Sequence, residues 1–187
     1  MNPSKTVSNP ASRTNLIIVM GVSGSGKSTL AKALAENYGY VYLDADDFHS
    51  DAARAQMARK IPLTDEQRAP WIALLKQRLQ ESAKTHSHSV LAFSGLKQKH
   101  RDQLRNAGLR TIFLFLNSHK ATIQTRLSHR TNHFMAPELL DSQFDSLEIP
   151  QHEVDVYSVN ADRSVEQVMN QAKTIADSVL LENNSTT

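Results

Sequence analysis

Short apolar runs alternate along the chain with stretches in which apolar residues recur every three or four positions. The five runs lie at 16–20, 40–43, 90–93, 111–116 and 154–159. Each run has the length and continuity typical of a strand that is buried on both faces. Strands that alternate with helices predict an α/β fold, in which a five-stranded parallel sheet carries helices on both faces. Ligands of such folds bind at the carboxyl ends of the strands.

Capping residues mark where several of the helices begin and end. Gly39 is expected to end the first helix, because glycine readily adopts the left-handed conformation found there. Thr64 and Gln67 form the pattern of a capping box at the start of a long helix. The expected apolar stripe of that helix consists of Trp71, Leu74, Leu75 and Leu79. Ser118 and Ser164 are the expected caps of two later helices.

The chain is predicted to form one domain between two polar ends. Residues 1–14 include two prolines and show no apolar periodicity, so they are expected to be a disordered arm. Residues 183–187 are expected to be a tail. This leaves 15–182 as a single domain, within which the sequence shows neither a linker nor an internal repeat.

The composition excludes several kinds of site and partner but does not identify the reaction. The 187 residues include no cysteine, which excludes disulfide scaffolds, thiolate zinc sites, iron–sulfur clusters and cysteine nucleophiles. The formal net charge is +2 and no long basic stripe is present, so a nucleic-acid partner is not indicated. No apolar run approaches the ~20 residues of a membrane span. We therefore expect neither a nucleic-acid nor a membrane partner, and a cytoplasmic location.

A glycine-rich turn directly after the first apolar run carries the clearest chemical signature. Residues 21–28 read GVSGSGKS and match the phosphate-binding pattern G-x-x-x-x-G-K-[ST]. The glycines let backbone N–H groups approach phosphate oxygens, and the following helix directs its positive end toward them. Lys27 is expected to bridge the β- and γ-phosphates of ATP, and Ser28 to ligate Mg²⁺. The predicted nucleotide-binding residues are Gly21, Ser23, Gly24, Ser25, Gly26, Lys27, Ser28 and Thr29.

Several classes of nucleotide-binding protein share this pattern. A chain of 187 residues without an appended domain is small for an ATPase motor, and the sequence has no guanine-recognition motif of the N-K-x-D kind. Small-molecule kinases are therefore the leading class. A nucleotide-binding regulator with a decayed acceptor site is the alternative from a different class.

Two carboxylates follow the second apolar run, where the ligand crevice is expected. Asp44 and Asp46 are two positions apart, so their side chains project the same way if the strand geometry persists. One carboxylate suits a Mg²⁺-bound water, and the other suits the proton of an attacking hydroxyl. The alternative is a cluster of helix N-caps before Phe48, which applies more to Asp47 than to Asp46.

Five segments in register give the chain a resemblance to the gluconokinase family of P-loop kinases. They read GVSGSGKST, LDADDFH, IPLTDEQRAPW, SGLKQKHRDQLR and HFMAPELLDSQFDSLEIP. The resemblance implies a nucleoside-monophosphate-kinase-like fold with a helical substrate-side insertion at about 47–85 and a lid at about 126–146. It also implies ATP-dependent phosphorylation of D-gluconate to 6-phosphogluconate, with Mg²⁺ as cofactor, and it suggests a homodimer.

The resemblance assigns acceptor-side roles residue by residue. Asp46 would orient or deprotonate the acceptor hydroxyl, and His49 would contact the acceptor beside it. Lys97 and Arg101 match the basic positions of the family and suit the carboxylate of a sugar acid, which arginine binds bidentately. These two residues are four positions apart and are expected to share one helix face.

The resemblance also implies a mobile lid over the phosphates. Arg126 and Arg130 would close on the ATP phosphates during transfer, and His133 would contact the acceptor. Residues 142–144 and 147–148 are expected to pack the lid helix rather than to take part in the chemistry. Ser28 and Asp44 are the expected Mg²⁺ ligands.

The acceptor side departs from the family pattern at several positions. The family segment H-P-x-x-N-x-x-K-M-x-x-G-x-P-L has its asparagine, lysine and glycine replaced by Ala53, Gln56 and Lys60. Further departures are Gly95, His100, Asn132 and the reversed pair Ala136-Pro137. A kinase for another small sugar acid or a related hydroxyl acceptor is therefore the alternative within the same class. Three interpretations of Lys60 stay open: replacement of a cation lost at Gln56, attraction of a more anionic acceptor, or a neutral change on a surface helix.

Overall fold

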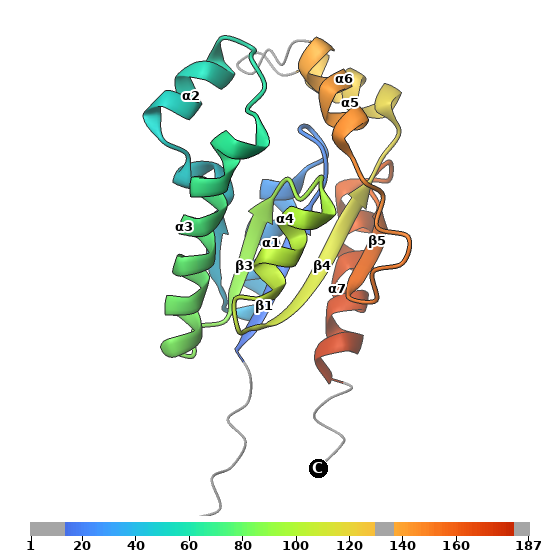
Figure 1. Cartoon of the computed structure of the whole chain (residues 1–187). Coiled ribbons are helices and arrows are strands. Elements are labelled where there is room, and N and C mark those ends of the chain that lie inside the picture. The colour runs from blue at the N-terminus through green and yellow to red at the C-terminus, as the bar shows by residue number, and fades with distance from the viewer. Residues whose placement is uncertain (1–13, 130–136, 182–187) are drawn as a thin grey trace, which may run out of the picture.

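Five parallel strands form one sheet at the centre of the computed structural model, which describes residues 14–129 and 137–181 (Figure 1). In chain order the strands are β1 (Asn15–Met20), β2 (Val41–Asp44), β3 (Ser89–Phe93), β4 (Arg110–Asn117) and β5 (Val156–Asn160). They are arranged as β2-β3-β1-β4-β5, and every neighbouring pair is parallel. The predicted α/β fold is confirmed, and each strand begins and ends within two residues of its predicted position.

Helices cover both faces of the sheet and extend beyond its carboxyl edge (Figure 1). One face carries α1 (Lys27–Tyr38) and α7 (Val165–Leu181), and the other carries α3 (Asp65–Lys84) and α4 (Gln98–Arg105). The remaining helices are the 3₁₀ helix η1 (Ala45–Phe48), α2 (Asp51–Ala58), α5 (Lys120–Ser128) and α6 (Pro137–Ser146). Figure 1 shows α2, α5 and α6 beyond the tips of the strands. Within the described part of the chain, no helix is both long enough and apolar enough to cross a membrane.

The central strand β1 explains why the apolar runs are continuous. Leu16 and Ile18 are fully buried against the core shared with α3 and α4. Ile17 and Val19 are fully buried against the core shared with α1 and α7. Because successive side chains of a strand point to opposite faces, a sheet covered on both faces needs apolar residues at every position.

Three predicted helix ends are confirmed. Gly39 ends α1 in the left-handed region with a φ of 65°. Thr64 begins α3 with a complete capping box, because its hydroxyl accepts the N–H of Gln67 and its own N–H donates to the Gln67 side chain. Ser164 makes the same reciprocal pair with Gln167 at the start of α7.

Two expectations about helices are wrong. Leu74 is 46% exposed, and Ile72 takes its place in the core. At about 100° per residue, Ile72 lies only about 20° from Leu79 around the axis of α3, whereas Leu74 lies about 60° beyond Trp71 at the opposite edge of the buried arc. The N-cap of α5 is His119 rather than Ser118. The hydroxyl of Ser118 donates instead to Asp162, which joins the start of α5 to the loop after β5.

Candidate active site

A cavity of about 650 Å³ opens at the carboxyl edge of the sheet. Its walls are formed by the turn after β1, the ends of β2 and β3, the end of α2 with residues 60–63 after it, and parts of α3, α4 and α6. The predicted site residues that line it include Ser28, Asp46, His49 and Lys97. The cavity therefore brings residues from distant parts of the sequence to the edge where parallel α/β sheets bind ligands.

The glycine-rich turn uses backbone conformations that favour glycine. Gly24 and Gly26 have φ values of 80° and 98°, where a Cβ would be strained. A Cβ on Gly24 would also lie 3.0 Å from Leu127, because α5 packs directly on the turn. Gly26 is the N-cap of α1 and provides no side-chain cap. The first turn of α1 lines the cavity, so the positive end of the helix dipole is available for an anion.

Lys27 and Ser25 place polar groups in this phosphate cradle. The Lys27 ammonium donates to the carbonyl of Val22 at 2.9 Å, which folds the side chain back over the turn. The Ser25 hydroxyl is buried and has no hydrogen-bond partner among the described residues. Buried hydroxyls are normally satisfied, so the one on Ser25 suits a phosphate oxygen.

Asp44 connects the cradle to the acceptor segment. Its Oδ2 accepts hydrogen bonds from the hydroxyls of Ser28 at 3.0 Å and Tyr42 at 2.7 Å. Its Oδ1 accepts the N–H of Asp46 at 3.1 Å, so Asp44 is also the N-cap of η1. The oxygens of Ser28 and Asp44 are hard ligands of the kind that Mg²⁺ prefers. They fit Mg²⁺, which proteins usually hold through one or two carboxylates together with substrate phosphates.

His49 forms a buried polar wall next to Asp46. Its ring stacks on Trp71 at a centroid distance of 4.2 Å, and the Trp71 indole N–H donates to the carbonyl of Ala45 at 2.7 Å. The Nε2 atom of His49 lies 3.9 Å from the exposed Asp46 carboxylate, and Nδ1 has no partner among the described residues. Burial lowers the pKa of His49 below 6.5, although Asp46 opposes this shift. His49 therefore offers a neutral polar edge to a ligand at neutral pH.

Asp65 lies close to four basic side chains, three of which line the cavity. Its carboxylate pairs with Lys97 at 2.8 Å and Lys99 at 2.6 Å, and Arg68 lies 3.6 Å away. Hydrogen bonds from the two lysines hold the pKa of Asp65 well below its usual value. His100 lies 3.7 Å from the same carboxylate, and burial lowers its pKa to about 4. Arg68, Lys97 and His100 line the cavity, so an anion entering here would meet several cations and one carboxylate.

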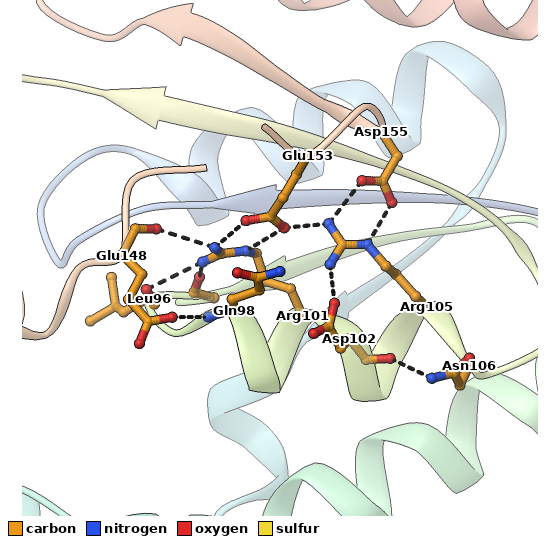
Figure 2. A network of polar contacts seen from close by, with 10 residues as sticks. Leu96, Gln98, Arg101, Asp102, Arg105, Asn106, Glu148, Glu153 and Asp155 are labelled. Carbon is orange, nitrogen blue, oxygen red and sulfur yellow. Dashed lines mark hydrogen bonds and ion pairs between the residues drawn. The ribbon is translucent and has the colours of Figure 1, made fainter. Parts of the chain in front are cut away.

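Arg101 does not reach the cavity, contrary to the expectation from the sequence. It is 0% exposed and pairs with Glu153 (Figure 2). Its guanidinium also donates to three backbone carbonyl groups, those of Gly95, Leu96 and Glu148. The expected shared face with Lys97 does not form, because Lys97 is the N-cap of α4 with extended φ and ψ of −102° and 138°. Helical spacing of four does not apply to a residue outside the helix.

The hydrogen-bond network around Arg101 supports a segment of the cavity wall without being part of it. Figure 2 shows Glu148 beside the start of α4, with hydrogen bonds to both Gln98 and the guanidinium of Arg101. The Glu148 carboxylate accepts the N–H of Gln98 at 2.6 Å, and its own N–H donates to the carbonyl of Leu96 at 2.8 Å. Leu96 and Lys97 line the cavity. Arg101 and Glu148 therefore position the cavity-lining segment without touching the cavity themselves.

The predicted lid residues are only partly within the described chain. Arg126 donates to the carbonyl of Ala161 at 2.6 Å, in the loop after β5. It would have to leave this carbonyl in order to contact a phosphate in the cavity. Arg130 and His133 lie outside the described residues.

Gln143 is a site residue that the sequence pattern assigned only to packing. Its side-chain oxygen accepts the N–H of Ser23 in the glycine-rich turn at 2.6 Å. The helix that carries it, α6, also packs on this turn through a cluster that includes Val22, Ile123 and Leu140. The contact joins residues 120 positions apart. No local signal predicts it, because polar residues on an amphipathic helix usually face solvent.

Comparison with known proteins identifies relatives over most of the chain. A protein-family model described as an AAA domain matches residues 16–149. The gluconokinase of Gluconobacter oxydans is 36% identical over 157 residues, which cover 84% of this chain and 88% of that protein.

Solved structures agree with this similarity. An unliganded sugar kinase from Janibacter has a TM-score of 0.83 at 37% identity, and the match covers 88% of this chain and 95% of that one. A gluconokinase from Sinorhizobium meliloti has a TM-score of 0.78 at 34% identity, and the match covers 90% of this chain and 97% of that one. The similarity therefore includes the glycine-rich turn, the acceptor segment and the sheet that positions them.

Replacing Arg101 should affect stability more than ligand contact. Arg101→Ala removes a buried cation and leaves Glu153 and three carbonyl groups short of donors, so we expect the free energy of unfolding to fall by about 3–5 kcal/mol. Chemical denaturation measures this change. The control is Lys99→Ala on the same helix, whose exposed pair with Asp65 should be worth at most about 1 kcal/mol. An unchanged stability with a raised acceptor KM would contradict the structural role.

His100 should make the fold sensitive to mild acid. Its pKa is about 4 in the folded chain and 6.5 by the usual value, so the unfolded chain takes up the proton first as the pH falls. Between pH 7 and pH 5 this difference should destabilise the fold by about 2 kcal/mol. His100→Phe removes the titrating group, so its free energy of unfolding should fall less over this range. Equal pH dependence of the two proteins would refute the assignment.

Proposed function

Because this chain belongs to the gluconokinase family, we propose that it transfers the γ-phosphate of ATP to a hydroxyl of D-gluconate. The product is 6-phosphogluconate. The observation that carries the proposal is the composition of the single cavity described above. It combines a phosphate cradle, the Asp46 carboxylate and a basic region suited to a sugar-acid carboxylate.

The donor half of the site is suited to the triphosphate of ATP. Backbone N–H groups of the glycine-rich turn and the first turn of α1 would hold the phosphate oxygens. Lys27 would exchange the Val22 carbonyl for oxygens of the β- and γ-phosphates. Ser28 and Asp44 would hold Mg²⁺, which neutralises phosphate charge when bound. Asp44 would keep the Ser28 hydroxyl oriented.

The acceptor half is suited to a polyol with a carboxylate. Asp46 would accept the proton of the attacking hydroxyl, whose oxygen forms a bond to the γ-phosphorus. The bond from that phosphorus to the bridging oxygen of ADP breaks in the same step. His49 would hydrogen-bond neighbouring hydroxyls, and Lys97 would face the carboxylate. Phosphoryl transfer depends mainly on positioning and charge stabilisation, and these are the functions that the side chains here can supply.

Asp46→Asn should slow turnover with little effect on ATP binding. Loss of the base should lower kcat about 10²–10⁴-fold, because the amide cannot accept the proton. The measurement is gluconate-dependent ADP release at saturating ATP. Asp47→Asn is the matched control, since Asp47 is the adjacent exposed carboxylate and does not line the cavity. Similar losses in both variants would argue against a role of Asp46 as the base.

The acceptor itself can be tested with a panel. We expect ADP release with gluconate to exceed that with other aldonic acids, shikimate and nucleoside monophosphates. Faster turnover with another aldonic acid would replace gluconate as the acceptor and leave the kinase assignment in place. ATP binding without acceptor-dependent ADP release would favour the nucleotide-binding regulator instead.

A further inference from the structure

Lys60 has a backbone conformation that disfavours any side chain with a Cβ. Its φ is 65°, and the other non-glycine residue with a positive φ in the described chain is His86, at 54°. Residues in this region are strained unless they are glycine, and such strain is often found at functional sites. The strain at Lys60 therefore requires an explanation.

Three helices end in the same way, so Lys60 can be compared with equivalent residues. In each, one residue donates its N–H to a carbonyl three positions back, and the next residue donates to a carbonyl five positions back. This is the Schellman motif, in which glycine is the usual residue at the left-handed position. The position is occupied by Gly39 after α1, Lys60 after α2 and His86 after α3. The motif itself gives no reason for a lysine.

Hydrogen bonds on both sides hold Lys60 in this conformation. Gln56 and Gln67 form a reciprocal pair of side-chain amide bonds at 3.1 and 2.9 Å, which joins the end of α2 to the start of α3. Gln56 also donates to the carbonyl of Pro62 at 3.0 Å. Gln67 is at the same time part of the capping box with Thr64. The segment that contains Lys60 is thus fixed at both ends, as is needed for a strained residue to persist.

Lys60 differs from His86 in what it faces. Lys60 lines the cavity, together with the following residues 61–63. His86 is exposed in the turn between α3 and β3, at the amino edge of the sheet. Figure 1 shows this turn at the end of the molecule opposite α2. Lys60 therefore contributes a basic residue from the α2–α3 turn to a cavity lining that also includes Arg68 from α3 and Lys97 from the start of α4.

We propose that Lys60 is a specificity-determining residue that binds the anionic group of the acceptor. The inference rests on the proposed function, because it needs a sugar-acid acceptor. Arg68 and Lys97 pair with Asp65 in the same cavity, and Lys60 brings a third basic side chain to the wall that an acceptor carboxylate would contact. A charge-assisted hydrogen bond from an ammonium to a carboxylate is stronger than one between neutral groups. Lys60 thereby favours a sugar acid over an uncharged sugar of the same size.

The matched pair Lys60→Gly and His86→Gly tests this proposal. Both substitutions relieve a left-handed residue in the same motif, so each should raise Tm by about 2–4 °C. Only Lys60→Gly should lower kcat/KM for gluconate, by about tenfold, with the KM for ATP unchanged. Trp71 is the only tryptophan of the chain and lines the cavity, so its fluorescence gives the gluconate Kd separately from turnover. Lys60→Arg should retain most of the gluconate affinity.

An uncharged acceptor distinguishes charge recognition from a general effect. With D-gluconamide, the neutral amide of gluconate, wild type and Lys60→Gly should have the same kcat/KM. An unchanged kcat/KM for gluconate in Lys60→Gly, or an equal loss in His86→Gly, would overturn the inference. A wild-type protein that is inactive with gluconate and with every other sugar acid would instead overturn the proposed function.

Discussion

The carboxylate of Asp44 joins three parts of the chain that the proposed reaction needs at fixed separations. It accepts hydrogen bonds from Ser28 in α1, Tyr42 in β2 and the backbone of Asp46 in η1. Burial and the bond to Asp44 raise the pKa of Tyr42, so the phenol remains a donor at neutral pH. The phosphate cradle and the proposed base are thereby placed before a ligand arrives. Such pre-positioning is a main source of catalysis in phosphoryl transfer.

The two halves of the cavity use different kinds of groups. The phosphate cradle depends mainly on backbone N–H groups, whose position is set by glycine conformations and by the packing of α1, α5 and α6. The acceptor half depends on side chains, among them His49, Lys60 and Lys97. A side-chain substitution has little effect on phosphate binding by backbone N–H groups. The same kind of substitution in the acceptor half changes the groups that contact the acceptor. Two departures from the family pattern, Lys60 and His100, lie on the side-chain half, which is where specificity can change without loss of ATP binding.

The sequence predicted the features that depend on local chemistry. The order of the strands and helices, the cap at Gly39 and the capping box at Thr64 follow from residue types at short spacing, and all were confirmed. The placement of Asp46 and Lys97 at the cavity followed from the parallel sheet and the family motif.

Features that depend on distant contacts were missed. The sequence does not distinguish Arg101 from Lys97, whereas the burial of Arg101 depends on distant acceptors, the Glu153 carboxylate 52 positions away and the Glu148 carbonyl 47 positions away. The Gln143 contact with Ser23 spans 120 positions. Neither has a local signal, because a charged or amide side chain on a helix is equally compatible with solvent, a ligand or a distant partner.

The acceptor wall at α2 is attached to the molecule differently from the rest of the fold. No residue of α2 is buried, so its position depends on hydrogen bonds and helix caps rather than on core packing. The hydrogen bonds are the Gln56–Gln67 amide pair and those from Arg54 to the carbonyls of Asp47 and His49. Segments with few buried apolar contacts open at a lower free energy than the core does. A ligand bound at Lys60 would add a contact to this segment. An acceptor bound at Lys60 as proposed would therefore stabilise both the strained conformation of Lys60 and the position of the weakly attached α2.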